Sequence, residues 1–137
     1  MKKGSALLLA VLIIALFLGL ASLFTKMVYN NYAGANAALV REQAFWLAEA
    51  GLEQGKTELA HNPNWYTDLP HYPEDNVPWL ANCAVGQTAP LGDGSFKVVR
   101  ENGKNWLYSI GCKGKGLVVL KLTFSNPPWQ NIEWKEL

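Results

Sequence analysis

The chain has 137 residues, and its 12 Lys and Arg side chains nearly balance 11 Asp and Glu side chains, for a formal net charge of +1. So small a charge provides no electrostatic surface for nucleic acid, and no nucleic-acid partner is predicted. The length is enough for one small domain beyond any membrane segment, with a modest core.

The N-terminus predicts a membrane segment. After Met1-Lys2-Lys3-Gly4, residues 5–24 (SALLLAVLIIALFLGLASLF) are uncharged and largely apolar. About twenty residues at the helical rise of about 1.5 Å span about 30 Å, the thickness of a bilayer's hydrocarbon core. A secretory signal would have a shorter apolar core, closed by a cleavage site on its far side. Here a cleavage signal would lie before the apolar run.

Residues 25–61 predict an amphipathic continuation of this helix. Apolar side chains recur at helical spacing in Phe45, Ala48, Leu52 and Leu59, with charged residues between them. Gly34 lies in a weaker small and polar stretch, where a kink would be unsurprising. The helix should end by residues 61–62, because Pro63 disfavours helical geometry in the residue before it.

The basic leader, the glycine, the apolar run and the amphipathic helix together resemble the type IV pilin-like proteins. The resemblance covers Lys2 to roughly Leu59, and residues 43–60 (QAFWLAEAGLEQGKTELA) resemble the Ala-Glu-Ala block of the minor pilins grouped with PilX. It implies that a prepilin peptidase cuts after Gly4, so that residues 1–4 are a leader peptide. It also implies methylation of the new N-terminal residue, here Ser5, where the family most often has phenylalanine.

Leu9 is the fifth residue after the implied cut, where the major pilins have a glutamate that is thought to pair with the terminal amine of a neighbouring subunit. An unpaired carboxylate in hydrocarbon is costly, so its absence fits a subunit with no subunit above it, as in the K-type pseudopilins of type II secretion. Leu9 would fit a plain membrane anchor equally well, but the 43–60 block favours the minor pilin. The small residues Ala6, Ala10 and Gly19 would let neighbouring helices approach closely during assembly.

The resemblance implies a non-catalytic structural subunit, a minor pilin or pseudopilin, assembled through its N-terminal helix at or near the filament tip. Its implied partners are other pilin-like subunits, the prepilin peptidase, the membrane and the inner-membrane assembly platform. Lys2 and Lys3 on one side of the span, against Lys26 on the other, favour a C-terminus outside the inner membrane. From there the subunit would pass into a periplasmic or extracellular filament. A type IV pilus, a type II secretion pseudopilus and a DNA-uptake filament all remain open, because they differ in neighbouring subunits.

Residues 62–137 predict a globular part with loops first and strands afterwards. Residues 62–92 contain five prolines and little periodicity, so we expect irregular structure with short helical turns at most. From Ser95 onward three strand-like segments follow, and Asn102-Gly103 signals a tight hairpin turn between the first two. The expected fold is α+β and pilin-like, a long helix packed on one face of a three-stranded antiparallel sheet. The tail, residues 126–137, is expected to add an edge strand or a strap over the core.

Alternation along the predicted strands identifies the faces of the sheet. Phe96 and Val98 share one face of the first strand, and the aromatic pair Trp106 and Tyr108 lies with Ile110 on one face of the second. On the third strand we expect the apolar set at 118, 120, 122 and 124 to be buried. Of the tryptophans, Trp46 and Trp106 are expected in the core, Trp65 and Trp79 more in the core than on the surface, and Trp129 and Trp134 equally in either.

Cys83 and Cys112 both fall in the outer portion, where an even count in an oxidising compartment predicts one disulfide. Two buried free thiols are the alternative. The bridge would close a loop of about 30 residues and stabilise the domain by about 3.5 kcal/mol.

No catalytic, metal or cofactor motif was found. His61, His71, Glu74 and Asp75 have no spacing typical of a metal site and are interpreted as solvated loop residues. The chain is therefore predicted not to be an enzyme and to need no cofactor. The alternative function is a signal-anchored extracellular binding module that recognises a sugar or peptide through the aromatic loop at residues 62–80.

Overall fold

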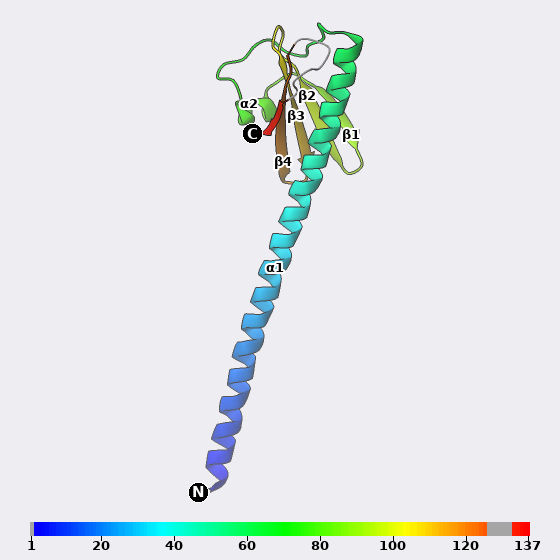
Figure 1. Ribbon diagram of the computed structural model, residues 1–137. Coiled ribbons are helices and arrows are strands. Elements are labelled where there is room, and N and C mark those ends of the chain that lie inside the picture. Colours follow the sequence, from blue (N-terminus) through cyan, green and yellow to red (C-terminus); the bar gives the residue numbers. More distant parts are fainter. Residues whose placement is uncertain (1, 126–132) are drawn as a thin grey trace. The chain divides into compact units, whose positions relative to one another are not determined.

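A computed structural model describes residues 2–125 and 133–137, and the chain divides into two units, Met1–Ala38 and Leu39–Leu137. Helix α1 (Lys2–His61) starts in the first unit and ends in the second (Figure 1). It ends two residues before Pro63, as predicted. Gly34 does not interrupt the helix.

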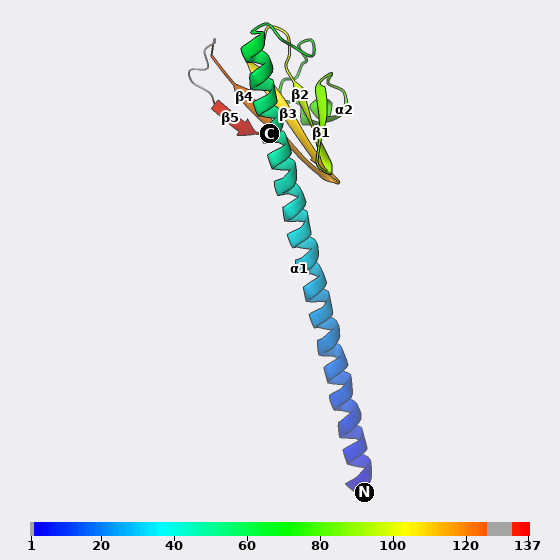
Figure 2. The ribbon, with the colours of Figure 1, turned by 90° about the vertical axis from the view of Figure 1, so that its right-hand side faces the viewer.

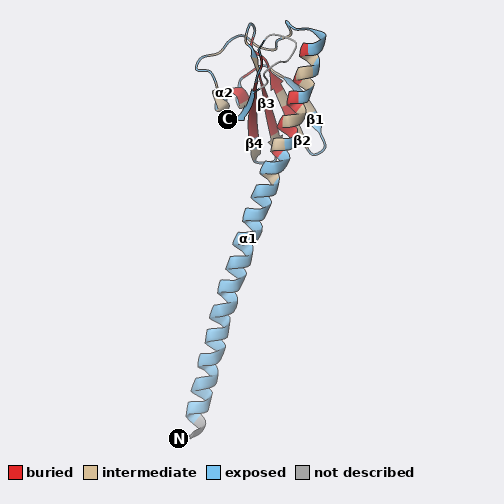
Figure 3. Ribbon diagram, in the orientation of Figure 1, coloured by how far each residue is buried: buried red, intermediate tan, exposed pale blue. Residues whose placement is uncertain are grey.

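The first unit consists of helix without a covering layer. From Gly4 to Ala38 every residue is exposed, including the whole predicted membrane segment at 5–24 (Figure 3). This stretch of the chain buries none of its apolar side chains against residues of its own unit.

The second unit is built on a five-stranded antiparallel sheet. Its strands follow the chain order, and each pairs with the next. They are β1 (Gln87–Leu91), β2 (Gly94–Val99), β3 (Trp106–Lys113), β4 (Gly116–Thr123) and β5 (Glu133–Glu136). The prediction of an α+β fold with an antiparallel meander is confirmed, but the number of strands is larger than expected.

Strand β1 lies in the stretch that was expected to be irregular. Its residues are mostly exposed and include Pro90, so neither alternation nor composition marks it as a strand. It pairs with β2 alone, and an edge strand tolerates proline because one row of its backbone groups needs no partner. The helical turn expected in this region is present as α2 (Val77–Asn82).

The β2–β3 hairpin is present, but its connection is longer than the tight turn expected at Asn102-Gly103. The connection runs from residue 100 to 105, with Gly103 at φ 74°. The first residue of this connection binds the loop after α1. The carbonyl of Arg100 accepts hydrogen bonds from the backbone N–H groups of Thr67 and Asp68 at 2.8 and 3.2 Å. Two-residue turns instead join β1 to β2, with Gly92 at φ 59°, and β3 to β4, with Gly114 at φ 55°.

The α1 segment of the second unit packs on one face of the sheet. The apolar face of β4 is buried as predicted, together with Phe96, Val98 and Leu107. Helix and sheet approach closely at glycines: a Cβ atom at Gly111 would overlap the carbonyl oxygen of Ala44. On the helix side, a Cβ atom at Gly51 would overlap Oγ of the buried Ser109.

The opposite face of the sheet is also covered, although only one face was expected to be. Leu80 of α2 and the nearby Ala84 belong to a second core cluster there. Figure 1 shows α2 beside the sheet. The sheet residues of this cluster are Val99, Tyr108, Ile110 and Val119. The proline-rich stretch therefore supplies a second layer, which its weak periodicity did not indicate.

The tail forms the second edge strand. Figure 2 shows β5 beside β4, where Trp134 pairs in register with Leu122. Trp129 lies outside the described residues, so the expectation for its side chain is not addressed. Arg41 of α1 and Glu136 of β5 form an ion pair of 2.6 Å.

Candidate functional site

The first candidate site is the exposed apolar part of α1. Among the described residues, α1 is the one helix long and apolar enough to cross a membrane by length and composition. The structure is therefore compatible with the predicted span at 5–24. Lipid or other apolar helices would suit the surface of an exposed helix of this composition.

Four residues of this helix were predicted to matter in assembly. Ala6, Leu9 and Ala10 are spaced at three and four residues and therefore share one side of α1, whereas Gly19 lies on a different side. All four are exposed, and so are the predicted processing residues Gly4 and Ser5 in the first turns of the helix.

The two cysteines are free thiols in the structure, and no bond joins them. Cys83 is the exposed C-cap residue of α2, and Cys112 is partly buried near the end of β3. The ammonium group of Lys97 interacts electrostatically with both thiols and donates to the carbonyls of Ala81 and Ala84. The disulfide between the two cysteines remains a prediction.

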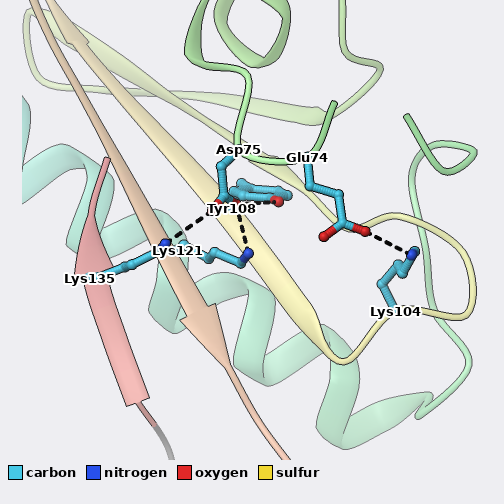
Figure 4. Close-up of polar contacts among 6 residues, drawn as sticks. All are labelled: Glu74, Asp75, Lys104, Tyr108, Lys121 and Lys135. Carbon is cyan, nitrogen blue, oxygen red and sulfur yellow. Dashed lines mark hydrogen bonds and ion pairs between the residues drawn. The ribbon is translucent and has the colours of Figure 1, made fainter. Parts of the chain in front are cut away.

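A second candidate site is a polar cluster centred on Asp75, in the loop before α2 (Figure 4). Oδ1 of Asp75 accepts hydrogen bonds from Nζ of Lys121 at 2.6 Å and from Oη of Tyr108 at 2.9 Å. Oδ2 accepts from Nζ of Lys135 at 3.0 Å. One carboxylate thus joins the loop to β3, β4 and β5. We call these four residues the Asp75 cluster.

Electrostatics favour the charged form of this carboxylate. Burial alone would raise the pKa of Asp75, but hydrogen bonds from Lys121, Lys135 and Tyr108 together lower it to about 2. Burial and the bond to Asp75 raise the pKa of Tyr108, so its hydroxyl stays protonated and can donate. Asp75 itself has φ 58°, a left-handed conformation that aspartate tolerates better than most residues.

Lysines and aromatic rings surround the cluster. The ammonium groups of Lys104 and Lys121 lie 5.0 and 4.5 Å from the centroid of the Trp106 ring, within cation–π range. Lys104 also pairs with Glu74 at 3.0 Å, and that hydrogen bond raises the pKa of Lys104. Trp106 was expected in the core. It is partly buried and packs against the second core cluster.

The residues weighed as metal ligands have other partners. Nδ1 of His61 lies 2.8 Å from the carbonyl oxygen of Thr57, and the His71 ring stacks on Trp79 at 3.9 Å between centroids. Within residues 2–125 and 133–137 no group of His, Cys, Asp and Glu side chains could hold a metal ion. The interpretation of Asp75 as a solvated loop residue was wrong, since it ties its loop to the sheet.

Trp46 was expected in the core but is 60% exposed, and it borders a surface pocket beside Leu91 and Gly94 at the edge of the sheet. Trp134 is 57% exposed. Trp65 packs against the first core cluster and Trp79 against the second, as favoured by the sequence.

A third candidate site is a groove beside the first core cluster, between α1 and the β4–β5 edge. Its lining is mostly apolar, with three charged side chains. The residues are Phe45, Glu49, Leu52, Glu53, Lys56, Leu120, Leu122 and Trp134. We call this the α1–β5 groove. Phe45 and Trp134 meet across it in an edge-on contact, with ring centroids 6.2 Å apart.

Sequence reasoning did not find the Asp75 cluster or the buried Arg100, whose guanidinium donates to the carbonyls of Pro63, Trp65 and Lys104. Their partners lie more than 30 residues away in several cases, and no periodicity reports such pairs. The available signal was weak: Lys121 interrupts an apolar strand, and a buried lysine needs an acidic partner.

In comparisons with known proteins, no family model matches the chain, and no curated protein or solved structure matches it either. Evidence for function therefore comes from the N-terminal sequence, the exposed apolar helix and the geometry of the second unit.

Proposed function

We propose that the chain is a non-catalytic structural subunit of a type IV filament system, a minor pilin or pseudopilin. It is processed after Gly4 and assembled through its N-terminal helix. The observation that carries this proposal is the apolar helix at 5–24, preceded by a basic leader and a glycine and wholly exposed in its own unit. Such a helix has to be covered by something outside the chain.

Assembly would replace lipid around this helix with the same segments of other subunits. Because lipid tails are as apolar as leucine, packing rather than hydrophobic transfer would drive the exchange. Ala6 and Ala10 on one side of the helix would permit close approach of a first neighbour. Gly19 on a different side would permit it for a second.

The second unit suits a subunit whose outer part is rigid. Its sheet is covered on both faces, and the Asp75 cluster ties the loop before α2 to three strands. The alternative, a binding module that uses the aromatic loop at 62–80, has less support because Trp65 and Trp79 pack into the domain. Tyr66 and Tyr72 remain exposed there as the surface for such a module.

Processing gives the direct test. The full chain is expressed in bacteria with and without a prepilin peptidase, and the intact mass of the membrane-extracted protein is measured. We expect the peptidase to remove Met1–Gly4 and leave a chain that starts at Ser5. Gly4→Leu should block the cut, whereas Gly19→Leu, the matched change inside the span, should not.

Retention of all four leader residues in the presence of an active peptidase would contradict the proposal. A second readout is the sheared filament fraction from cells that assemble type IV filaments. The processed chain should appear there, and the Gly4→Leu variant should stay in the membrane fraction.

A further inference from the structure

The α1–β5 groove carries a charge that its own residues do not neutralise. Glu49 and Glu53 lie one helical turn apart on its α1 wall, and Lys56 pairs with Glu53. Glu49 has no ion pair or hydrogen bond to any side chain that the structure describes. Like charges at this spacing destabilise a helix slightly, so a cation at Glu49 would be favourable.

The composition of the groove suits a lysine from another polypeptide. Leu52, Leu120 and Leu122 form an apolar floor, and the rings of Phe45 and Trp134 border it. A lysine combines a long apolar stem with a charged end, so its stem could lie on the floor while its ammonium group meets Glu49.

The second unit itself presents one such lysine. Nearly all of its described basic side chains are held by carboxylates or backbone carbonyls. They are Arg41, Lys56, Lys97, Arg100, Lys104, Lys113, Lys121 and Lys135. Among the described residues 39–125 and 133–137, Lys115 alone of the basic side chains has neither kind of partner. It is exposed in the two-residue turn between β3 and β4, beside Gly114.

Lys115 cannot reach Glu49 in its own chain. The turn meets α1 near Val40, which a Cβ atom on Gly116 would contact. Glu49 lies nine residues further along the helix, about 13 Å at 1.5 Å per residue, which is beyond the length of a lysine side chain.

We infer that the α1–β5 groove receives Lys115 from a second copy of the chain, which pairs with Glu49. The inference rests on the proposed function, since it supplies a contact between neighbouring subunits. In a filament this contact is heterologous, with the turn of one copy in the groove of the next, and a joined pair keeps one free turn and one free groove for further copies. Head-to-tail contacts that do not close generate open helical assemblies.

A zero-length carbodiimide cross-link tests the pair. Full-length chains labelled with ¹⁴N and ¹⁵N are mixed, reconstituted together in phospholipid vesicles and treated with the reagent, which joins a carboxylate to an amine in contact. Mass spectrometry should identify a Glu49–Lys115 link in peptides of mixed isotope, that is, between copies. Glu42, an exposed glutamate on the same helix outside the groove, is the internal control and should link at least fivefold less.

A charge swap keeps the test independent of the chemistry of the cross-link. Glu49→Lys and Lys115→Glu should each lower the fraction of associated chains in sedimentation equilibrium at least threefold, and the double variant should recover it to within twofold. Glu42→Lys should leave it unchanged. Circular dichroism of each variant checks that the fold is kept.

Three results would overturn the inference: links of Glu49 to Lys26 or to an N-terminal lysine instead of Lys115, equal linkage of Glu42 and Glu49, or no recovery in the double variant. Cleavage after Gly4 does not depend on this pair. Cleavage after Gly4 without a Glu49–Lys115 link would overturn the inference and keep the proposed function. A Glu49–Lys115 link without cleavage would overturn the proposed function and keep the contact between copies.

Discussion

Ile14 and Ile110 are chemically identical side chains in opposite environments. Ile14 lies in the unit Met1–Ala38, where every described side chain from Gly4 onward is exposed, and Ile110 is 1% exposed in the second core cluster of Leu39–Leu137. The second unit covers both faces of its sheet with its own residues. The first unit provides no such cover among its described residues, and in the proposed function lipid or other subunits supply it.

The largest expected effects come from placing a charge at each isoleucine. Ile110→Asp buries an unpaired carboxylate and should unfold the second unit, because it lowers the free energy of unfolding by more than about 4 kcal/mol. Ile14→Asp should make membrane insertion less favourable by about 3 kcal/mol and leave the second unit folded. Carbonate extraction measures membrane retention, and the denaturant midpoint of the detergent-solubilised chain measures the domain. If Ile110→Asp lost membrane retention and Ile14→Asp kept it, the assignment of membrane insertion to the first unit and of domain stability to the second would be contradicted.

Smaller effects on stability are expected for alanine at two glycines, and the two effects have opposite signs. Gly111→Ala forces helix and sheet apart at Ala44 and should destabilise the second unit by about 2 to 3 kcal/mol. Gly34→Ala in the first unit meets no atom within 4 Å and should stabilise the helix by about 1 kcal/mol. Thermal unfolding reports the first change, and amide hydrogen exchange along α1 reports the second. Equal midpoints for Gly111→Ala and the unsubstituted chain would show that the close approach is absent.

The smallest effect is the pH dependence of the Asp75 cluster. The pKa of Asp75 is lowered to about 2 in the folded chain from its ordinary 3.8, so the stabilisation is complete above about pH 4 and is lost as the pH falls through about 2. It amounts to about 1 to 2 kcal/mol, because the carboxylate is partly exposed.

Asp75→Asn should remove this contribution at pH 7 and flatten the stability profile between pH 2 and 4. Asp93→Asn is the matched control, since the Asp93 side chain is almost fully exposed and its ion pair with Lys113 should contribute less than about 0.5 kcal/mol. Denaturant unfolding of both variants across this pH range measures the difference. A profile for Asp75→Asn that keeps the slope of the unsubstituted chain would exclude the cluster as its source.

Several features of the fold were predictable because they depend on neighbours in the sequence. The apolar run at 5–24, the end of α1 before Pro63 and the buried alternate residues of β4 each follow from a local pattern. The edge strand in the tail was one of two expectations, and β5 confirms it for residues 133–136.

Other features depended on partners far away in the chain. Strand β1 lacks an alternating pattern because both of its faces are largely exposed, so only its pairing with β2 makes it a strand. The exposure of Trp46 depends on which side of α1 meets the sheet. That side carries Ala44 and Ala48, which lie close to Gly111 of the sheet.

The sequence by itself determined where the apolar helix lies, where it ends and which alternate residues of the sheet are buried. Those properties are set by side-chain periodicity and backbone sterics within a few residues. Only the tertiary structure decided that the proline-rich stretch covers the second face, that Asp75 holds three strands and that Glu49 borders an apolar groove. These arrangements depend on contacts between residues that are distant in the sequence, and each such partner is selected by packing and charge in three dimensions.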